Sequence, residues 1–271
     1  MQIFHASSES PQISCADRSF QYGDGIFTTA LVVAGKVVYL QDHLTRLQTA
    51  AAKLGIEGID LEALAAAMVE VATSQNFGGI KVLVSRGEGG RGYDPSGCRD
   101  TIAVISCFEL PTHYERWQQE GISLAIAKTP LAVNPFLAGL KTTSRLEQVV
   151  AKQELKTLGS DDAVFSNAAG NMVETNVANL FWRVGSQCFT PDLTQSGVTG
   201  IMRARVMEHL EQMDISCQVV AEPVNVLEKS DEIWVTNSLM QVVPVRLFNG
   251  KRMSDFVVSR RLQGVIGEAL S

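Results

Sequence analysis

The fold of this chain is decided around one stretch, Leu140-Lys141-Thr142-Thr143-Ser144-Arg145-Leu146-Glu147-Gln148. The segment before it, residues 130–139, is apolar and contains two prolines and a glycine. The pattern after it predicts a helix from Glu147 to Leu158. A lysine held in an apolar setting loses its preference for the charged form and becomes an amine nucleophile. The alternative is an ordinary surface lysine ahead of a helix, and the rest of the chain decides between the two.

Length and composition limit the class of protein. A chain of 271 residues suits one large or two smaller domains. A hydrophobic fraction of 45% with 19% charged residues is typical of a soluble globular protein with a sizeable core. The net charge of −6 and the lack of a basic run argue against bulk nucleic-acid binding, so we expect no nucleic-acid partner.

The sequence also indicates the compartment. Residues 1–6 lack a basic region followed by an apolar one, so we expect no signal peptide. No window approaches 18 uninterrupted apolar residues, so we expect no membrane span. The five cysteines are scattered without a CxxC pair, and the four histidines have no ligand spacing, so we expect neither a metal site nor a disulfide framework. A reducing cytoplasm fits this pattern.

The N-terminal part predicts strands with two helices on one face, an α+β arrangement. Asp42 and Asp60 are the expected caps of the two helices. In the strand that follows Gly25, side chains two apart share a face, so Phe27 and Thr29 point one way. The polar segment 111–121 is predicted to be a connector. We therefore expect a small domain over residues 1–115, a linker over 116–121 and a larger domain over 122–271.

A glycine-rich loop follows the predicted strand Gly79–Ser85. The segment Arg86–Tyr93 has four glycines and two arginines in eight residues. Glycines let a backbone approach a ligand closely, and guanidinium groups suit carboxylates. A plain hairpin turn with solvated arginines is the alternative interpretation.

Three further features lie in the second half. Glu174 stands in mostly uncharged surroundings, where a buried carboxylate needs a partner. The turn Gly197–Gly200 precedes a helix that is predicted to run to Met213, and such a helix start attracts anions. The strand Asp231–Ser238 ends in small polar residues, a second candidate for phosphate contact.

Four features need one explanation: an activatable lysine, a lone glutamate, a helix-start anion site and a glycine loop with arginines. Pyridoxal phosphate chemistry uses these parts together: a lysine for the aldehyde, a carboxylate for the pyridine nitrogen and a helix N-terminus for the phosphate. The sequence therefore favours an enzyme with this cofactor.

The sequence resembles the class IV aminotransferases, the fold type IV enzymes that use pyridoxal phosphate. The resemblance runs over nearly the whole chain and rests on these matches: Glu174, Asn179-Leu180-Phe181, Thr190, Val198-x-Gly200-Ile201-x-Arg203, the segment Phe20–Thr29, the segment Ser85–Tyr93, Gly139-x-Lys141 and Arg145–Gln148. It implies a two-domain α/β fold: a small α+β N-terminal domain and a larger C-terminal domain with a β-barrel-like sheet and helices. It also implies a cofactor between the domains and a homodimer.

The resemblance assigns roles to individual residues. Lys141 matches the Schiff-base lysine, and Glu174 matches the partner of the pyridine nitrogen. Arg46 matches an arginine on the cofactor phosphate, although by itself it would be taken for a surface residue. The remaining cofactor matches are the amides of Ile201 and Met202 and the hydroxyl of Ser238 on the phosphate, and Val198 on the ring face. The substrate matches are Arg91 and Tyr93, which meet a carboxylate in a D-amino-acid relative, and we add Phe27 to that side.

The lyase-like motifs imply conversion of the small molecule 4-amino-4-deoxychorismate to 4-aminobenzoate and pyruvate, in folate biosynthesis. In that hypothesis Lys141 moves the proton, and Thr29 is our candidate to assist departure of the leaving group. A D-amino-acid or branched-chain aminotransferase of the same fold is the alternative. Leu146 disfavours the branched-chain class, since those relatives carry a tyrosine there. The third hypothesis is a non-catalytic α/β binding protein in which Lys141 is structural.

Overall fold

The computed structural model describes residues 1–5 and 12–270. The chain folds into two compact units. Unit 1 comprises Met1–Leu110 together with Lys141–Arg145, and unit 2 comprises Pro111–Leu140 together with Leu146–Ser271. The five residues around the candidate lysine therefore pack with the N-terminal unit, although they lie in the second half of the sequence.

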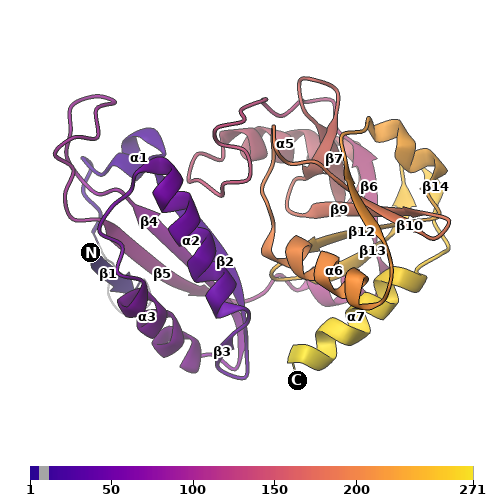
Figure 1. Ribbon diagram of the computed structural model, residues 1–271, viewed down its shortest axis with the longest axis horizontal. Helices are drawn as coiled ribbons and strands as arrows, with labels where there is room; N and C mark the ends of the chain where they lie inside the picture. Colours follow the sequence, from indigo (N-terminus) through magenta and orange to yellow (C-terminus); the bar gives the residue numbers. More distant parts are fainter. Residues whose placement is uncertain (6–11, 271) are drawn as a thin grey trace. The chain divides into compact units, whose positions relative to one another are not determined.

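Unit 1 is built on a five-stranded sheet in the order β1-β5-β4-β2-β3. Its strands are β1 (Gln2–His5), β2 (Gly25–Val33), β3 (Lys36–Val37), β4 (Phe77–Ser85) and β5 (Ile102–Phe108). β1 runs parallel to β5, and the other neighbours are antiparallel. The helices α2 (Leu40–Leu54) and α3 (Leu61–Thr73) lie along one face of this sheet (Figure 1).

The alternation of side chains in β4 explains this layering. Ile80, Val82 and Val84 are fully buried, whereas Lys81 between them is exposed. Side chains two residues apart share a face, so one face of the strand supplies the core under the helices. The helices pack on this face through their own apolar stripe, on which Leu47 is fully buried.

The ends of the helices in unit 1 differ partly from expectation. The side chain of Asp60 accepts the amide of Ala63 at 2.9 Å, so the predicted cap of α3 is confirmed. The predicted cap of α2 is wrong: the helix begins earlier, after Tyr39 in a left-handed conformation, and Asp42 lies inside its first turn. A short helix that the sequence pattern did not indicate, α1 (Arg18–Tyr22), is capped by Asp17.

Unit 2 is built on a nine-stranded sheet in the order β11-β10-β9-β12-β13-β6-β7-β8, and β14 also pairs with β13. Its strands are β6 (Ile122–Ile126), β7 (Asp162–Ser166), β8 (Met172–Thr175), β9 (Asn179–Val184), β10 (Gln187–Pro191), β11 (Cys217–Val220), β12 (Glu232–Asn237), β13 (Gln241–Phe248) and β14 (Lys251–Arg252). The sheet curls, because its edge strand β8 also contacts β9 and β10.

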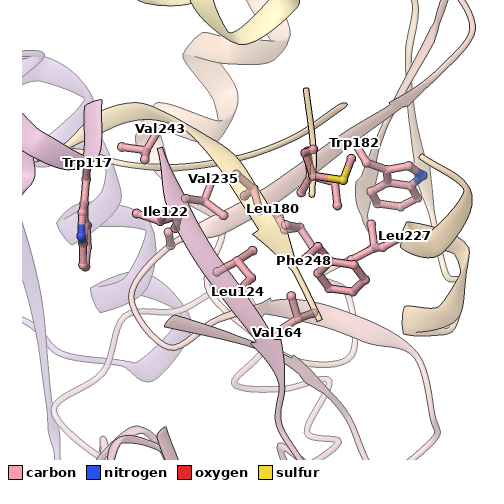
Figure 2. Packing of buried hydrophobic residues seen from close by; sticks show 14 of the residues in the cluster. Trp117, Ile122, Leu124, Val164, Leu180, Trp182, Leu227, Val235, Val243 and Phe248 are labelled. Carbon is pink, nitrogen blue, oxygen red and sulfur yellow. The ribbon is translucent and has the colours of Figure 1, made fainter. Parts of the chain in front are cut away.

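The curled sheet encloses the core of unit 2. Figure 2 shows Ile122 and Leu124 of β6 among Leu180 of β9, Val235 of β12 and Phe248 of β13. These side chains are almost completely buried. Burial of this apolar surface is the main contribution to the stability of the unit.

The helices of unit 2 are α4 (His113–Glu120), α5 (Leu146–Leu158), α6 (Ile201–Gln212) and α7 (Val257–Leu270), with a 3₁₀ helix over Val224–Lys229. The prediction that residues 111–121 form a polar connector is wrong, because most of the segment is helical. The segment forms α4, since Trp117 on the inner side joins the core and the polar residues face outward. None of the described helices is long and apolar enough to cross a membrane.

Candidate active site

Lys141 lies against strand β2 in unit 1. Its carbonyl accepts the amide of Phe27 at 2.9 Å, and Thr142 forms a bridge with Ile26. The Nζ atom lies 4.7 Å from the centre of the Phe27 ring. A ring face attracts an ammonium group, so Phe27 orients the amine. The structure thus brings Lys141 and Phe27 together, while Thr29 lies two residues further along the same strand.

Arg46 lies on α2 and is partly exposed. One turn earlier on this helix, His43 is buried, and its Nδ1 lies 2.6 Å from Oγ1 of Thr28 on β2. Burial, with the positive charge of Arg46 as a second cause, lowers the pKa of His43 to about 3. The histidine therefore packs α2 onto the sheet as a neutral group, and it fixes the helix that carries Arg46.

The glycine-rich segment joins β4 to β5, and Arg91 and Tyr93 are exposed on it. The two arginines of this segment lie in different surroundings, since Arg91 is exposed and Arg86 is bound inside the protein. Arg86 donates to Asp24 through Nε at 2.8 Å and Nη2 at 3.0 Å, and to the carbonyl of Leu54 at 2.8 Å. The suggestion that both guanidinium groups serve a ligand is therefore wrong for Arg86, whose donors are used inside the protein.

Glu174 lies on β8 in unit 2 and is 7% exposed. Its Oε2 accepts the amide of Val198 at 3.0 Å and the side-chain amide of Asn179 at 3.4 Å. Asn179 also donates to the carbonyl of Val198 at 2.9 Å. A buried carboxylate needs such donors, and together they hold it in one orientation.

The turn beside Glu174 leads directly into α6. Gly200 is the N-cap residue and has no side chain, and no acidic residue lies in the first turn of this helix. The amides of Ile201 and Met202 have no acceptor within the helix, because the first turn of any helix lacks one. The start of α6 therefore keeps its positive dipole end and fits an anionic group such as a phosphate.

Close packing leaves no freedom in this turn. A Cβ atom added to Gly200 would lie 1.9 Å from Oδ1 of Asn179, and one added to Gly197 would lie 2.6 Å from Val173. Gly197 also has a φ of +86°, which favours glycine. The backbone of Gly139, two residues before Lys141 in the chain, pairs with Val198 of the same turn.

Arg203 connects α6 to the neighbouring strand. Its Nε donates to Oγ1 of Thr190 at 3.2 Å, and its Nη2 donates to the carbonyl of Pro191 at 3.0 Å. Burial lowers the pKa of this guanidinium, which is 9% exposed. These contacts tie the helix start to β10.

The predicted residues fall into two groups. Unit 1 carries Lys141, Phe27, Thr29, Arg46, Arg91 and Tyr93, and unit 2 carries Glu174, Val198, Ile201, Met202 and Ser238. Ser238 directly follows β12 and is partly buried. Sequence reasoning gave no task to Asn179, and it missed the pair Arg18 and Asp24. The adjacent charges in Asp17-Arg18 ahead of Gly23-Asp24-Gly25 were the signal available for the latter.

Comparisons with known proteins show the family of the chain. The family model of the class IV aminotransferases matches residues 25–248. The chain is 39% identical to an aminodeoxychorismate lyase of Vibrio harveyi over 93% of this chain and 94% of that one. It is 28% identical to a putative branched-chain-amino-acid aminotransferase of Methanocaldococcus jannaschii, over 90% and 87% of the two chains. The structure of 4-amino-4-deoxychorismate lyase from Pseudomonas aeruginosa superposes with a TM-score of 0.90 at 32% identity, covering 96% of each chain.

Proposed function

The chain belongs to the class IV aminotransferase family, and on that premise we propose that it is a pyridoxal-phosphate-dependent carbon–oxygen lyase. Its substrate is 4-amino-4-deoxychorismate, and its products are 4-aminobenzoate and pyruvate, a step of folate biosynthesis. The observation that carries the proposal is Glu174, a buried carboxylate held by the amide of Val198 at 3.0 Å beside a helix start that fits a phosphate.

The residues present fit the cofactor. Lys141 would hold its aldehyde carbon, and Glu174 would keep its pyridine nitrogen protonated. The amides of Ile201 and Met202 at the start of α6, the hydroxyl of Ser238 and the guanidinium of Arg46 would hold the phosphate. Val198 would supply an apolar contact to the ring. Pyridoxal phosphate, once bound, supplies an electron sink for negative charge at the carbon that bears the amine.

The chain's own groups move the protons. The Nζ atom of Lys141 takes the proton from the substrate carbon that bears the amine. The carbon–oxygen bond to the enolpyruvyl group then breaks at the neighbouring carbon, the ring becomes aromatic and the enol takes up a proton as pyruvate. The hydroxyl of Thr29, on the same face of β2 as Phe27, assists this departure as an acid. Arg91 and Tyr93 hold substrate carboxylates.

Two assays on the full chain with added pyridoxal phosphate test the proposal. The first follows pyruvate and 4-aminobenzoate from 4-amino-4-deoxychorismate, and the second follows amino transfer between amino acids and 2-oxo acids. We expect stoichiometric release of both products in the first assay. Amino transfer without pyruvate release would establish an aminotransferase and contradict the lyase. A pure protein without a borohydride-sensitive absorbance band would support the binding-protein hypothesis.

A lysine pair provides the matched control. The Nζ atoms of Lys141 and Lys81 lie 4.7 Å and 4.9 Å from the same Phe27 ring. We expect Lys141→Ala to abolish both the absorbance band and product formation, whereas Lys81→Ala keeps the band. Loss of the band in both variants would mean that positive charge near Phe27, not attachment to Lys141, accounts for it.

We also propose that the protein is a cytoplasmic homodimer, because the family resemblance implies a homodimer and the cysteine pattern fits the cytoplasm. Free cysteines at all five cysteine positions suit a reducing compartment.

The N-terminal unit carries a hollow of about 420 Å³ lined by apolar side chains such as Leu83 and Val104. Phe20 at its edge is 73% exposed, which suits cover by a second copy. Light scattering tests this, since a monomeric mass for the active enzyme would contradict it.

A further inference from the structure

One buried guanidinium organises the glycine-rich segment of unit 1. Arg18, at the start of α1, is 4% exposed. Its Nη1 donates to the carbonyls of Gly92 at 3.0 Å and of Gly89 and Asp94 at 3.4 Å. Its Nη2 donates to the carbonyl of Tyr93 at 3.4 Å. Four carbonyls of one short segment therefore converge on a single side chain.

The backbone of this segment is folded so that its carbonyls point inward. Gly89 and Gly90 have φ values of +121° and +73°, which favour glycine. A Cβ atom on Gly90 would lie 2.0 Å from the carbonyl oxygen of Asp94 and 3.2 Å from Nη1 of Arg18. The glycines make the inward fold possible, and Arg18 supplies the donors that its carbonyls need.

The Nε group of Arg18 ties the segment to the rest of unit 1. Its Nε donates to Oδ2 of Asp24 at 2.8 Å, and the same oxygen accepts Nε of Arg86 at 2.8 Å. Burial raises the pKa of Asp24, but the hydrogen bonds from Arg86 and Arg18 outweigh it and the pKa is lowered. Arg86 in turn donates to the carbonyls of Leu54 and Gly55 at the end of α2. The ion cluster Arg18–Asp24–Arg86 thus links the segment to the helix that carries Arg46.

Aromatic contacts extend the same support to a predicted substrate residue. The guanidinium of Arg18 lies 5.1 Å from the ring centre of Tyr22, and that ring meets the ring of Tyr93 edge to face at 5.6 Å. Tyr93 itself is 87% exposed. Its orientation therefore depends on Tyr22 and, through it, on Arg18.

We propose that Arg18 is a positioning residue, which holds the segment Gly89–Asp94 in the conformation that presents Arg91 and Tyr93 to a substrate carboxylate. The role rests on the proposed function, in which those two residues bind substrate. Arg18 is not itself a substrate ligand, because it is buried and its donors are used by the segment and Asp24. A lysine in its place keeps the charge beside Asp24 but has no planar fork to reach several carbonyls.

The primary test is Arg18→Lys in the full-length enzyme with its cofactor. We expect the KM for 4-amino-4-deoxychorismate to rise about tenfold while kcat stays within about twofold, since binding and not chemistry is disturbed. The absorbance band should be unchanged. The exposed Arg99, in the connection that leads back to β5, provides the matched control, and Arg99→Lys should leave both constants unchanged. An unchanged KM in Arg18→Lys, or a fall in kcat alone, overturns the proposal.

A double mutant tests whether Arg18 acts through Arg91. In an Arg91→Ala background, Arg18→Lys should raise KM by less than about twofold, because the group that it positions is already gone. If Arg18→Lys raises KM by the same factor with and without Arg91→Ala, the two residues act independently and the proposal is overturned.

A second variant disturbs the segment while Arg18, Asp24 and Arg86 keep their identities. Gly90→Ala forces a clash with the Asp94 carbonyl and should reproduce the rise in KM. Gly97→Ala is the matched control, since Gly97 also has a positive φ, of +79°, but no atom lies within 4 Å of its added Cβ. Equal KM values for the two variants would contradict the proposal.

Hydrogen exchange separates failure of this inference from failure of the proposed function. Arg18→Lys should speed amide exchange over residues 88–94 about tenfold relative to the wild type, with α3 unchanged. If the wild type releases no pyruvate, the proposed function fails by itself, and exchange still decides the role of Arg18. Faster exchange confined to the segment supports the role, and unchanged exchange overturns it.

Discussion

The backbone amide of Val198 donates to Oε2 of Glu174 over 3.0 Å, and Asn179 donates to both partners. The carboxylate and the turn are therefore one hydrogen-bonded unit. The same turn pairs with Gly139, two residues before Lys141 in the sequence, and continues into α6. One short segment thus connects the candidate pyridine partner, the candidate phosphate site and the chain that leads to the candidate lysine.

Glu174→Gln tests the charge at this position. A glutamine oxygen still accepts the amide of Val198, so the shape is kept while the negative charge is lost. We expect kcat for pyruvate release to fall about a hundredfold with the absorbance band retained. Glu154→Gln is the control, because Glu154 also accepts two backbone amides, from Lys128 and Thr129, but lies on α5. Similar kcat values for both variants would remove Glu174 from the mechanism.

Gly200→Ala tests the close packing of the turn. The added methyl group would meet Oδ1 of Asn179 at 1.9 Å and push that side chain away from Glu174 and Val198. We expect a loss of about 1–3 kcal/mol in the free energy of unfolding and weaker binding of pyridoxal phosphate. Gly264→Ala on α7 meets nothing within 4 Å and serves as control. Urea unfolding and equilibrium dialysis measure the two effects, and unchanged cofactor affinity in Gly200→Ala would contradict the assignment.

The fold class is confirmed by the structural likeness to known lyases and aminotransferases, and some of the local features follow from the sequence. The helix after Lys141 and the helix capped by Asp60 follow from spacing and caps, which are local signals. Arg18 and the carbonyls that it binds are separated by more than 70 residues, so no local pattern reveals their contact. The polar composition of residues 113–120 predicts a connector, because it hides the anchoring aromatic residues Trp117 and Tyr114.

The sequence predicts which residues are candidates for the site, but not the contacts that they make. Lys141, Glu174 and the Gly197–Gly200 turn stand out by type and neighbours, and their roles stay predictions. The ion pair between Arg86 and Asp24 could not be predicted, because the two residues come close only when β2 and β4 pair. Burial, which decides whether a charged group serves the fold or a ligand, depends on tertiary packing.

His43 makes stability depend on pH. Burial, and secondarily the charge of Arg46, lower its pKa from 6.5 to about 3 in the folded chain. Below pH 6.5 the unfolded chain therefore binds a proton that the folded chain does not, so stability falls as the pH falls, by up to about 1.4 kcal/mol per pH unit. Urea unfolding at about pH 7.5 and about pH 5 should differ by roughly 2 kcal/mol in the wild type from this group alone. His43→Gln should lose that part of the dependence, and His209→Gln should keep it. An identical pH dependence in all three proteins would contradict the buried neutral state.

Two cysteines should resist modification for the same physical reason. Cys188 and Cys217 lie opposite each other on the neighbouring strands β10 and β11. Burial raises the pKa of the Cys188 thiol to about 12 and that of Cys217 to about 11. At about pH 8 only about one Cys188 in ten thousand is a thiolate, the form that reacts, so alkylation of the native protein should modify the exposed Cys15 long before either.

Mass spectrometry of alkylated peptides over time measures the order of reaction. In urea all three thiols should react at similar rates, which separates burial from any intrinsic difference in reactivity. Native Cys188 reacting as fast as Cys15 would mean that the β10–β11 edge opens readily. That edge holds Thr190 and Pro191, which fix Arg203 and the start of α6. Slow alkylation of Cys188 therefore also reports that the predicted phosphate end of the site rests on a closed, rigid edge.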